Sequence, residues 1–185
     1  MRTMVTLALG LAAALSAAPG RGAAGPVAPG HAGPAVSHDT AVERCADAKR
    51  HEFDFWLGSW TVRDSAGTEV GRSHISRAAD GCGIMERWTG SDGVSGTSLN
   101  VYDPESGHWR QFWVGGGGLV LRLTGGLEGT SMVLSGRHRS RSGSDVMDRI
   151  RWTPLEEGGV RQTWSVSTDG GDTWRVGFDG WYVAR

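Results

Sequence analysis

The stretch "EFDFWLGSWTVRD", residues 52–64, carries the strongest fold signal in the chain. It gathers Phe53, Phe55, Trp56, Leu57 and Trp60 around a single glycine, Gly58. Before it the sequence is rich in Gly, Ala and Pro, and after it short runs typical of β-strands begin. The stretch therefore marks the start of a folded domain, whose first strand contains Trp60.

The N-terminal residues predict export. Arg2 supplies a positive start, and residues 4–18 form an uncharged apolar run that ends in small residues, as in a signal peptide. That run is too short and too alanine-rich for a membrane span. We expect residues 1–18 to be a signal peptide, 19–40 a flexible Gly/Ala/Pro-rich lead-in, and 41–185 the domain of a periplasmic or secreted protein.

Charge and cysteine content narrow the function classes. The formal net charge is −1, so no overall basic excess favours nucleic acid, and we expect neither a nucleic-acid partner nor a membrane span. The chain has two cysteines, Cys45 and Cys82. In an exported protein an even pair indicates a disulfide, and the CxxC spacing of metal or redox sites is missing.

About ten β-type runs follow the opening stretch, separated by Asp-Gly, Gly-Gly and similar turn sequences that favour hairpins. Because nearly every connection is tight, strands that follow one another in the sequence should pair antiparallel. A meander of this length has two unpaired edge strands unless the first and last strands pair and close it into a barrel. We predict an all-β, up-and-down barrel of about ten strands. Residues 40–49 are the one helical candidate and would form a short N-terminal cap. The predicted runs are 56–64, 68–79, 82–90, 96–103, 108–114, 118–125, 130–137, 146–153, 160–167 and 173–184.

These features resemble a known group of proteins. The Gly58-Ser59-Trp60 start followed by a meander resembles the lipocalin-like, or calycin, barrels. An uncharacterised family of secreted bacterial proteins with this layout is similar in the pieces "FDFWLGSW", "DGCGIMERWTG", "GTSLNVYDPESGHWRQFWV", "IRWTPLEEGGVRQTWSVSTDGGDTW" and "FDGWY". The resemblance implies that Trp60 packs across the closed end of the barrel. It implies no activity.

Alternation along the strands predicts what faces the lumen. Three strands carry a polar residue two places before a tryptophan, which puts both side chains on one sheet face. If the indoles point inward, the lumen has apolar walls with a few orienting polar groups, as small-molecule pockets do. The alternative is a filled core, in which the polar groups only satisfy one another. The expected ligand-binding residues are Glu86, Trp88, Asn100, Tyr102, Gln111, Trp113, Trp152, Gln162 and Trp164.

Glu86 is the most interesting titratable residue in the sequence. A carboxylate among indoles would have its pKa raised by desolvation and could act as an acid or base. It could equally form a buried ion pair with Arg122 or Arg149. Asp148 and Asp179 are weaker candidates, and the sequence contains no established catalytic motif, so Glu86 would be catalytic only if the protein is an enzyme.

Metal and cofactor signatures are missing from the sequence. The histidines His51, His74, His108 and His138 lie on different segments without metal-ligand spacing. Heme-binding barrels of the nitrobindin type begin with a similar motif and use a late histidine, but here the last histidine is His138 and the final three strands contain none. We therefore predict no metal and no cofactor.

Three functions remain open at this point. The first is an exported barrel that binds a small apolar or amphipathic molecule. The second is an enzyme that works in the same cavity with Glu86 as acid or base. The third is a filled barrel that acts through its surface as an envelope interaction module.

Overall fold

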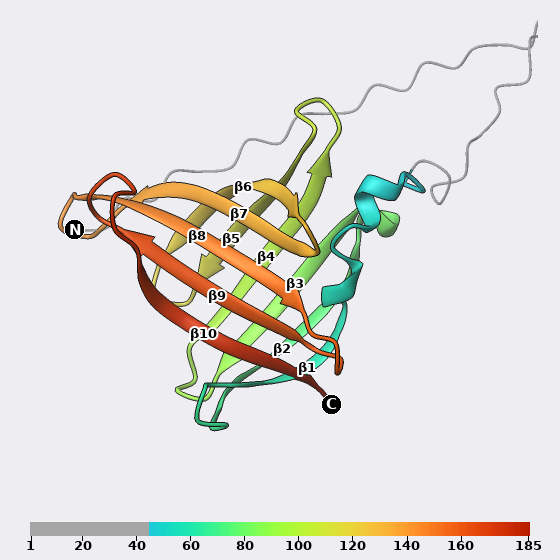
Figure 1. Ribbon diagram of the computed structural model, residues 1–185, viewed down its shortest axis with the longest axis horizontal. Coiled ribbons are helices and arrows are strands. Elements are labelled where there is room, and N and C mark those ends of the chain that lie inside the picture. Colours follow the sequence, from blue (N-terminus) through green and yellow to red (C-terminus); the bar gives the residue numbers. More distant parts are fainter. Residues whose placement is uncertain (1–44) are drawn as a thin grey trace, which may run out of the picture. The chain divides into compact units, whose positions relative to one another are not determined.

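The computed structural model describes residues 45–185. The predicted signal peptide and lead-in lie outside these residues, as do the first residues of the helical candidate at 40–49. Ten antiparallel strands form a closed barrel in the order β1-β10-β9-β8-β7-β6-β5-β4-β3-β2, so the predicted fold is confirmed (Figure 1). The strands are β1 (Gly58–Arg63), β2 (Glu69–Ala78), β3 (Gly83–Gly90), β4 (Ser95–Asp103), β5 (His108–Gly115), β6 (Val120–Glu128), β7 (Ser131–Arg139), β8 (Asp145–Pro154), β9 (Val160–Ser167) and β10 (Arg175–Ala184).

Tight turns connect these strands. Between β1 and β2, the Asp64 carboxylate accepts the backbone N–H groups of Ala66 and Thr68, each at 2.9 Å. Gly67 completes this turn with a φ of 82°, a conformation that favours glycine. Because each such turn returns the chain directly, nine of the strand pairs join sequence neighbours, and β1 pairs with β10 to close the barrel.

The opening stretch forms a plug at one end of the barrel. It contains the short 3-10 helix η2 (Asp54–Trp56), and a second short 3-10 helix, η1 (Ala48–His51), directly precedes it. Phe53 and Trp56 are completely buried and stack on each other with their ring centroids 4.9 Å apart. Trp60 is 7% exposed, and its indole N–H donates to the carbonyl of Trp56 at 2.9 Å. The five apolar side chains of the stretch therefore close one barrel end.

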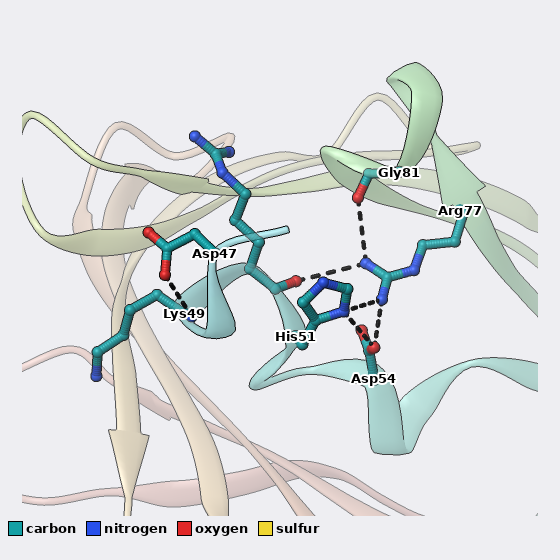
Figure 2. A network of polar contacts seen from close by, with 7 residues as sticks. Asp47, Lys49, His51, Asp54, Arg77 and Gly81 are labelled. Atoms are coloured by element: carbon teal, nitrogen blue, oxygen red, sulfur yellow. Dashed lines mark hydrogen bonds and ion pairs between the residues drawn. The ribbon is translucent and has the colours of Figure 1, made fainter. Parts of the chain in front are cut away.

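A polar network holds the plug against the barrel (Figure 2). Arg77, at the end of β2, forms an ion pair with Asp54 of η2. Its guanidinium also donates to the carbonyls of Arg50 and Gly81, at 3.4 and 3.2 Å. His51 Nδ1 lies 2.8 Å from Asp54 Oδ2. One arginine thus joins η1, η2 and the short helix η3 (Ala79–Gly81).

The predicted disulfide is present at the same end. Cys45 is joined to Cys82, with their Cα atoms 5.0 Å apart. Cys82 lies between η3 and β3, so the bond fixes the segment before the plug to the barrel wall. Among the described residues, no helix has the length and apolar character needed to cross a membrane.

Candidate functional site

Strand register arranges the lumen in layers above the plug. Nearest to the plug lies an aromatic floor. It includes Trp109, Trp152 and Tyr182, each of which exposes no more than 2% of its surface. Glu86 and Gln111 come one step further along β3 and β5, and Trp88 and Trp113 come a step beyond them. The inward positions therefore run from an aromatic floor, through a polar layer, to a rim of indoles.

These layers enclose a cavity of about 130 Å³. Its wall combines four indoles with other apolar side chains, one carboxyl group and two amides. The lining residues are Glu86, Trp88, Gln111, Trp113, Leu121, Ile150, Trp152, Gln162, Trp164, Phe178 and Tyr182.

The burial of these rings shows which way the cavity opens. Trp152 is 1% exposed and packs on the plug, with its ring centroid 5.4 Å from that of Trp56. Trp88, Trp113 and Trp164 are only half-buried. The cavity is therefore closed by the plug and opens at the opposite end, which we call the mouth.

Two serine hydroxyl groups hold the Glu86 carboxylate. Ser73 on β2 donates to Oε1 at 2.9 Å, and Ser98 on β4 donates to Oε2 at 3.1 Å. Glu86 itself is only 4% exposed. Because Ser98 lies directly opposite Glu86 in the β3–β4 register, the hairpin geometry positions this contact.

Further donors stand behind Ser98 in a row. Gln111 Nε2 donates to Asn100 Oδ1 at 2.7 Å, and Asn100 Nδ2 donates to Ser98 Oγ at 3.0 Å. Each donor in this row points toward Glu86, so successive hydrogen bonds polarise one another in favour of the ionised carboxylate. The row crosses β5, β4 and β3 without leaving the barrel interior.

Burial and hydrogen bonding compete at Glu86. Burial raises the pKa of Glu86 to about 7, and the hydrogen bonds from Ser73 and Ser98 oppose this rise without cancelling it. The group can therefore exchange a proton near neutral pH, which is the range in which a general acid or base works best. The pKa of the neighbouring Tyr182 is raised well above its usual value by burial and by the charge of Glu86, so its hydroxyl stays a donor.

Two more polar groups face or border the cavity. The Tyr182 hydroxyl donates to the Gln162 carbonyl oxygen. The indole N–H of Trp152 is buried and has no hydrogen-bond partner among the described residues. Leaving such a donor unsatisfied costs about 1–3 kcal/mol.

Seven of the nine residues predicted to bind a ligand line this cavity, and Asn100 and Tyr102 do not. Asn100 lies behind Gln111 and orients it. Tyr102 lies at the plug end, where its ring centroid is 6.2 Å from that of Trp109. Both residues lie on the inward strand face, as predicted. They lie at a different depth along the barrel axis from the cavity.

The suggested ion pair between Glu86 and an arginine is wrong. Arg122 lies over the ring of the exposed Phe112, 5.2 Å from its centroid, and Arg149 lies 3.9 Å from the ring centroid of Trp174. Both arginines therefore pack on the outer surface. Glu86 is partnered by neutral hydroxyls instead, so no positive charge counters the rise in its pKa that burial causes.

Asp148, a weaker acid–base candidate in the sequence, is a second buried carboxylate near the mouth, and sequence reasoning missed its contacts. Asp148 is fully buried; its Oδ1 accepts the Trp164 indole N–H at 2.9 Å, and its Oδ2 lies 2.6 Å from His138 Nδ1. His138 and Asp148 both occupy inward positions of the β7–β8 pair, which could have indicated the contact. Ser73 and Ser98 were missed too, although period two places them inward with Ile75 and Asn100.

The comparisons with known proteins add no family assignment. No protein-family model matches the chain, and no curated protein matches it. Within residues 45–185, no group of three or more His, Cys, Asp or Glu side chains is arranged to hold a metal ion.

Proposed function

We propose that this protein is an exported barrel that binds a small apolar or amphipathic molecule in its lumen. The observation that carries the proposal is the cavity of about 130 Å³ between the plug and the indole rim. Its lining joins apolar walls to a few polar groups, the usual composition of a ligand pocket. The Cys45–Cys82 disulfide supports export, because such bonds persist in oxidising compartments.

Cavity size limits the ligand. A cavity of roughly 150 Å³ with apolar walls holds one benzene molecule. The lumen of about 130 Å³ therefore suits one ring, or the ring end of a longer molecule that leaves through the mouth. The Glu86 carboxyl group and the side-chain amides of Gln111 and Gln162 line this cavity and favour a ligand with a polar group. We expect phenols, aryl alcohols or aryl ethers to bind better than plain hydrocarbons.

The experiment is calorimetric titration with phenol, benzyl alcohol and benzene. One-to-one binding is expected, with benzene weakest. Trp113→Ala should weaken phenol binding about tenfold, because the ring forms part of the rim. The matched control is Trp174→Ala, since Trp174 is also half-buried but lies outside the cavity. No binding by any of the three ligands, or equal loss in both variants, would contradict the proposal.

A second candidate function is catalysis with Glu86 as acid or base. The observation that favours it is the pKa of about 7 at a buried carboxyl group that lines the cavity. Glu86→Gln distinguishes the two functions: a binder keeps its affinity within a few-fold, whereas an enzyme keeps affinity and loses turnover. The third hypothesis, a filled barrel that acts through its surface, predicts no ligand in the lumen and is favoured only if the calorimetric test fails.

A further inference from the structure

The barrel wall splits between β6 and β7 at the mouth. The two strands pair from Glu128↔Ser131 at the plug end as far as Leu123↔Gly136. Gly136 approaches the carbonyl oxygen of Arg122 so closely that any Cβ there would clash, and beyond this contact the strands separate. Residues 120–122 of β6 and 137–139 of β7 therefore have a strand neighbour on one side only.

The split is a cleft of about 510 Å³. Glycines of the β5–β6 turn form one side, and β7 with the turn that follows it forms the other. Its lining residues are Gly117, Gly118, Leu119, Val120, Arg122, Arg137, His138, Arg139, Ser140 and Arg141. Four arginines and one histidine in a single cleft stand out in a chain whose formal net charge is only −1.

Among the described residues, most of the positive charge in the cleft has no acidic side chain paired with it. Arg139 lies 3.4 Å from Asp145, in a pair whose side chains are more than 70% exposed. Within residues 45–185, Arg122, Arg137 and Arg141 form no ion pair; Arg141 donates to the carbonyl of Gly117 at 2.7 Å across the cleft. Among the described residues, three arginines that line the cleft thus have no acidic partner, and one of them, Arg122, also lies over the Phe112 ring.

The other nearby carboxylate is already engaged. Asp148 is buried behind His138 and accepts from the Trp164 indole, so it does not reach the arginines. With Nδ1 held at 2.6 Å from Asp148, the nitrogen of His138 that remains for a ligand is Nε2.

We propose that the β6–β7 cleft binds a tetrahedral oxyanion, a phosphoryl or sulfuryl group carried by a small molecule. Guanidinium groups match such oxygens with paired N–H donors, and four arginines line this cleft where the pairing of β6 with β7 has ended. The volume leaves room for the organic part of the ligand. This site does not depend on whether the lumen is occupied.

Inorganic pyrophosphate is the probe, titrated into the full chain at low ionic strength and followed by calorimetry and by the ring signals of His138 in NMR. Saturable one-to-one binding is expected, with a shift of the His138 signals. Arg122→Gln with Arg137→Gln should weaken binding at least about tenfold, because two charged partners are lost. The control is Arg87→Gln, an exposed arginine on β3 outside the cleft, which should change binding less than about twofold.

A second arm separates the sources of the oxyanion. Phosphatidylcholine vesicles that contain phosphatidic acid are sedimented with the protein; binding that needs Arg137 assigns a lipid headgroup, whereas pyrophosphate binding without vesicle binding assigns a soluble ligand. If the double variant fails to fold, Arg137→Gln alone carries the test, because its guanidinium makes no hydrogen bond or ion pair among the described residues. The proposal is overturned if neither probe binds, or if Arg87→Gln weakens binding as much as Arg137→Gln.

Discussion

Tryptophan side chains lie at both ends of the barrel, but they pack on other rings at the plug and border the cavity at the mouth. At the plug end, Phe53 is completely buried and its ring lies within 5.7 Å of the rings of Trp56, Trp109 and Trp152. At the mouth, Trp88 borders the cavity, and its one ring contact among residues 45–185 is to Phe178, with the ring centroids 6.0 Å apart. Indoles that pack on other rings hold the fold together, and indoles that border a cavity are free to contact a ligand.

Trp60→Ala should give the largest effect and would break the plug. We expect a loss of about 3–5 kcal/mol in the free energy of unfolding, because a buried ring and its hydrogen bond to Trp56 are removed. Urea denaturation measures it. A loss below about 1 kcal/mol would mean that the ring does not support the barrel end.

Removing the disulfide tests how firmly the plug is attached. Cys45→Ser with Cys82→Ser should destabilise the protein by about 3–4 kcal/mol in the chain-entropy model, for a sequence separation of 37 residues. Thermal unfolding and the same urea titration are the measurements. Phenol binding at the mouth should persist in the folded variant, and an unchanged melting temperature would show that the plug needs no tether.

Glu86→Gln tests the polar layer between the two ends through its pH dependence. The folded pKa of about 7 lies above the usual unfolded value, so ionisation costs stability as pH rises from about 4.5 to 7. The variant lacks this cost and should be more stable than the parent at pH 8 by on the order of 2–3 kcal/mol. Below about pH 4.5 the advantage should vanish; a difference that stays constant with pH would contradict the raised pKa.

Trp113→Ala is the matched change at the mouth and should have the smallest effect on stability. The side chain is half-buried and borders empty space, so we expect a loss of about 1–2 kcal/mol. Urea denaturation beside Trp60→Ala gives the comparison directly. Equal losses at the two positions would remove the distinction between structural and ligand-facing indoles.

Much of the fold could be predicted because turn chemistry and alternation are local signals. The run 160–167 coincides with β9, whereas the run 173–184 begins two residues before β10. That difference arises because the Asp169 carboxylate accepts the backbone N–H of Thr173 and keeps it in the turn. Period two also identified most of the lumen-facing residues.

Depth along the barrel could not be predicted, since it depends on how far the plug enters and how each strand pair is offset. Tyr102 was therefore assigned to the pocket although it lies beside Trp109 at the plug end. The contact of His138 with Asp148 requires the β7–β8 register, and the cleft beside it requires the close approach at Gly136. Both depend on pairing between strands and leave no mark in the sequence of one strand.

The pairing of β1 with β10 has a consequence for how the barrel folds. Trp60 pairs with Ala184, whereas every other strand pair joins neighbours connected by a turn. Pairing β1 with β10 closes a loop that contains almost the whole domain, so it costs more chain entropy than any hairpin. No β1–β10 contact offsets that cost until the two strands meet. We expect the hairpins to form early, the seam to close last and limit the refolding rate, and the first partial opening of the native barrel to separate β1 from β10.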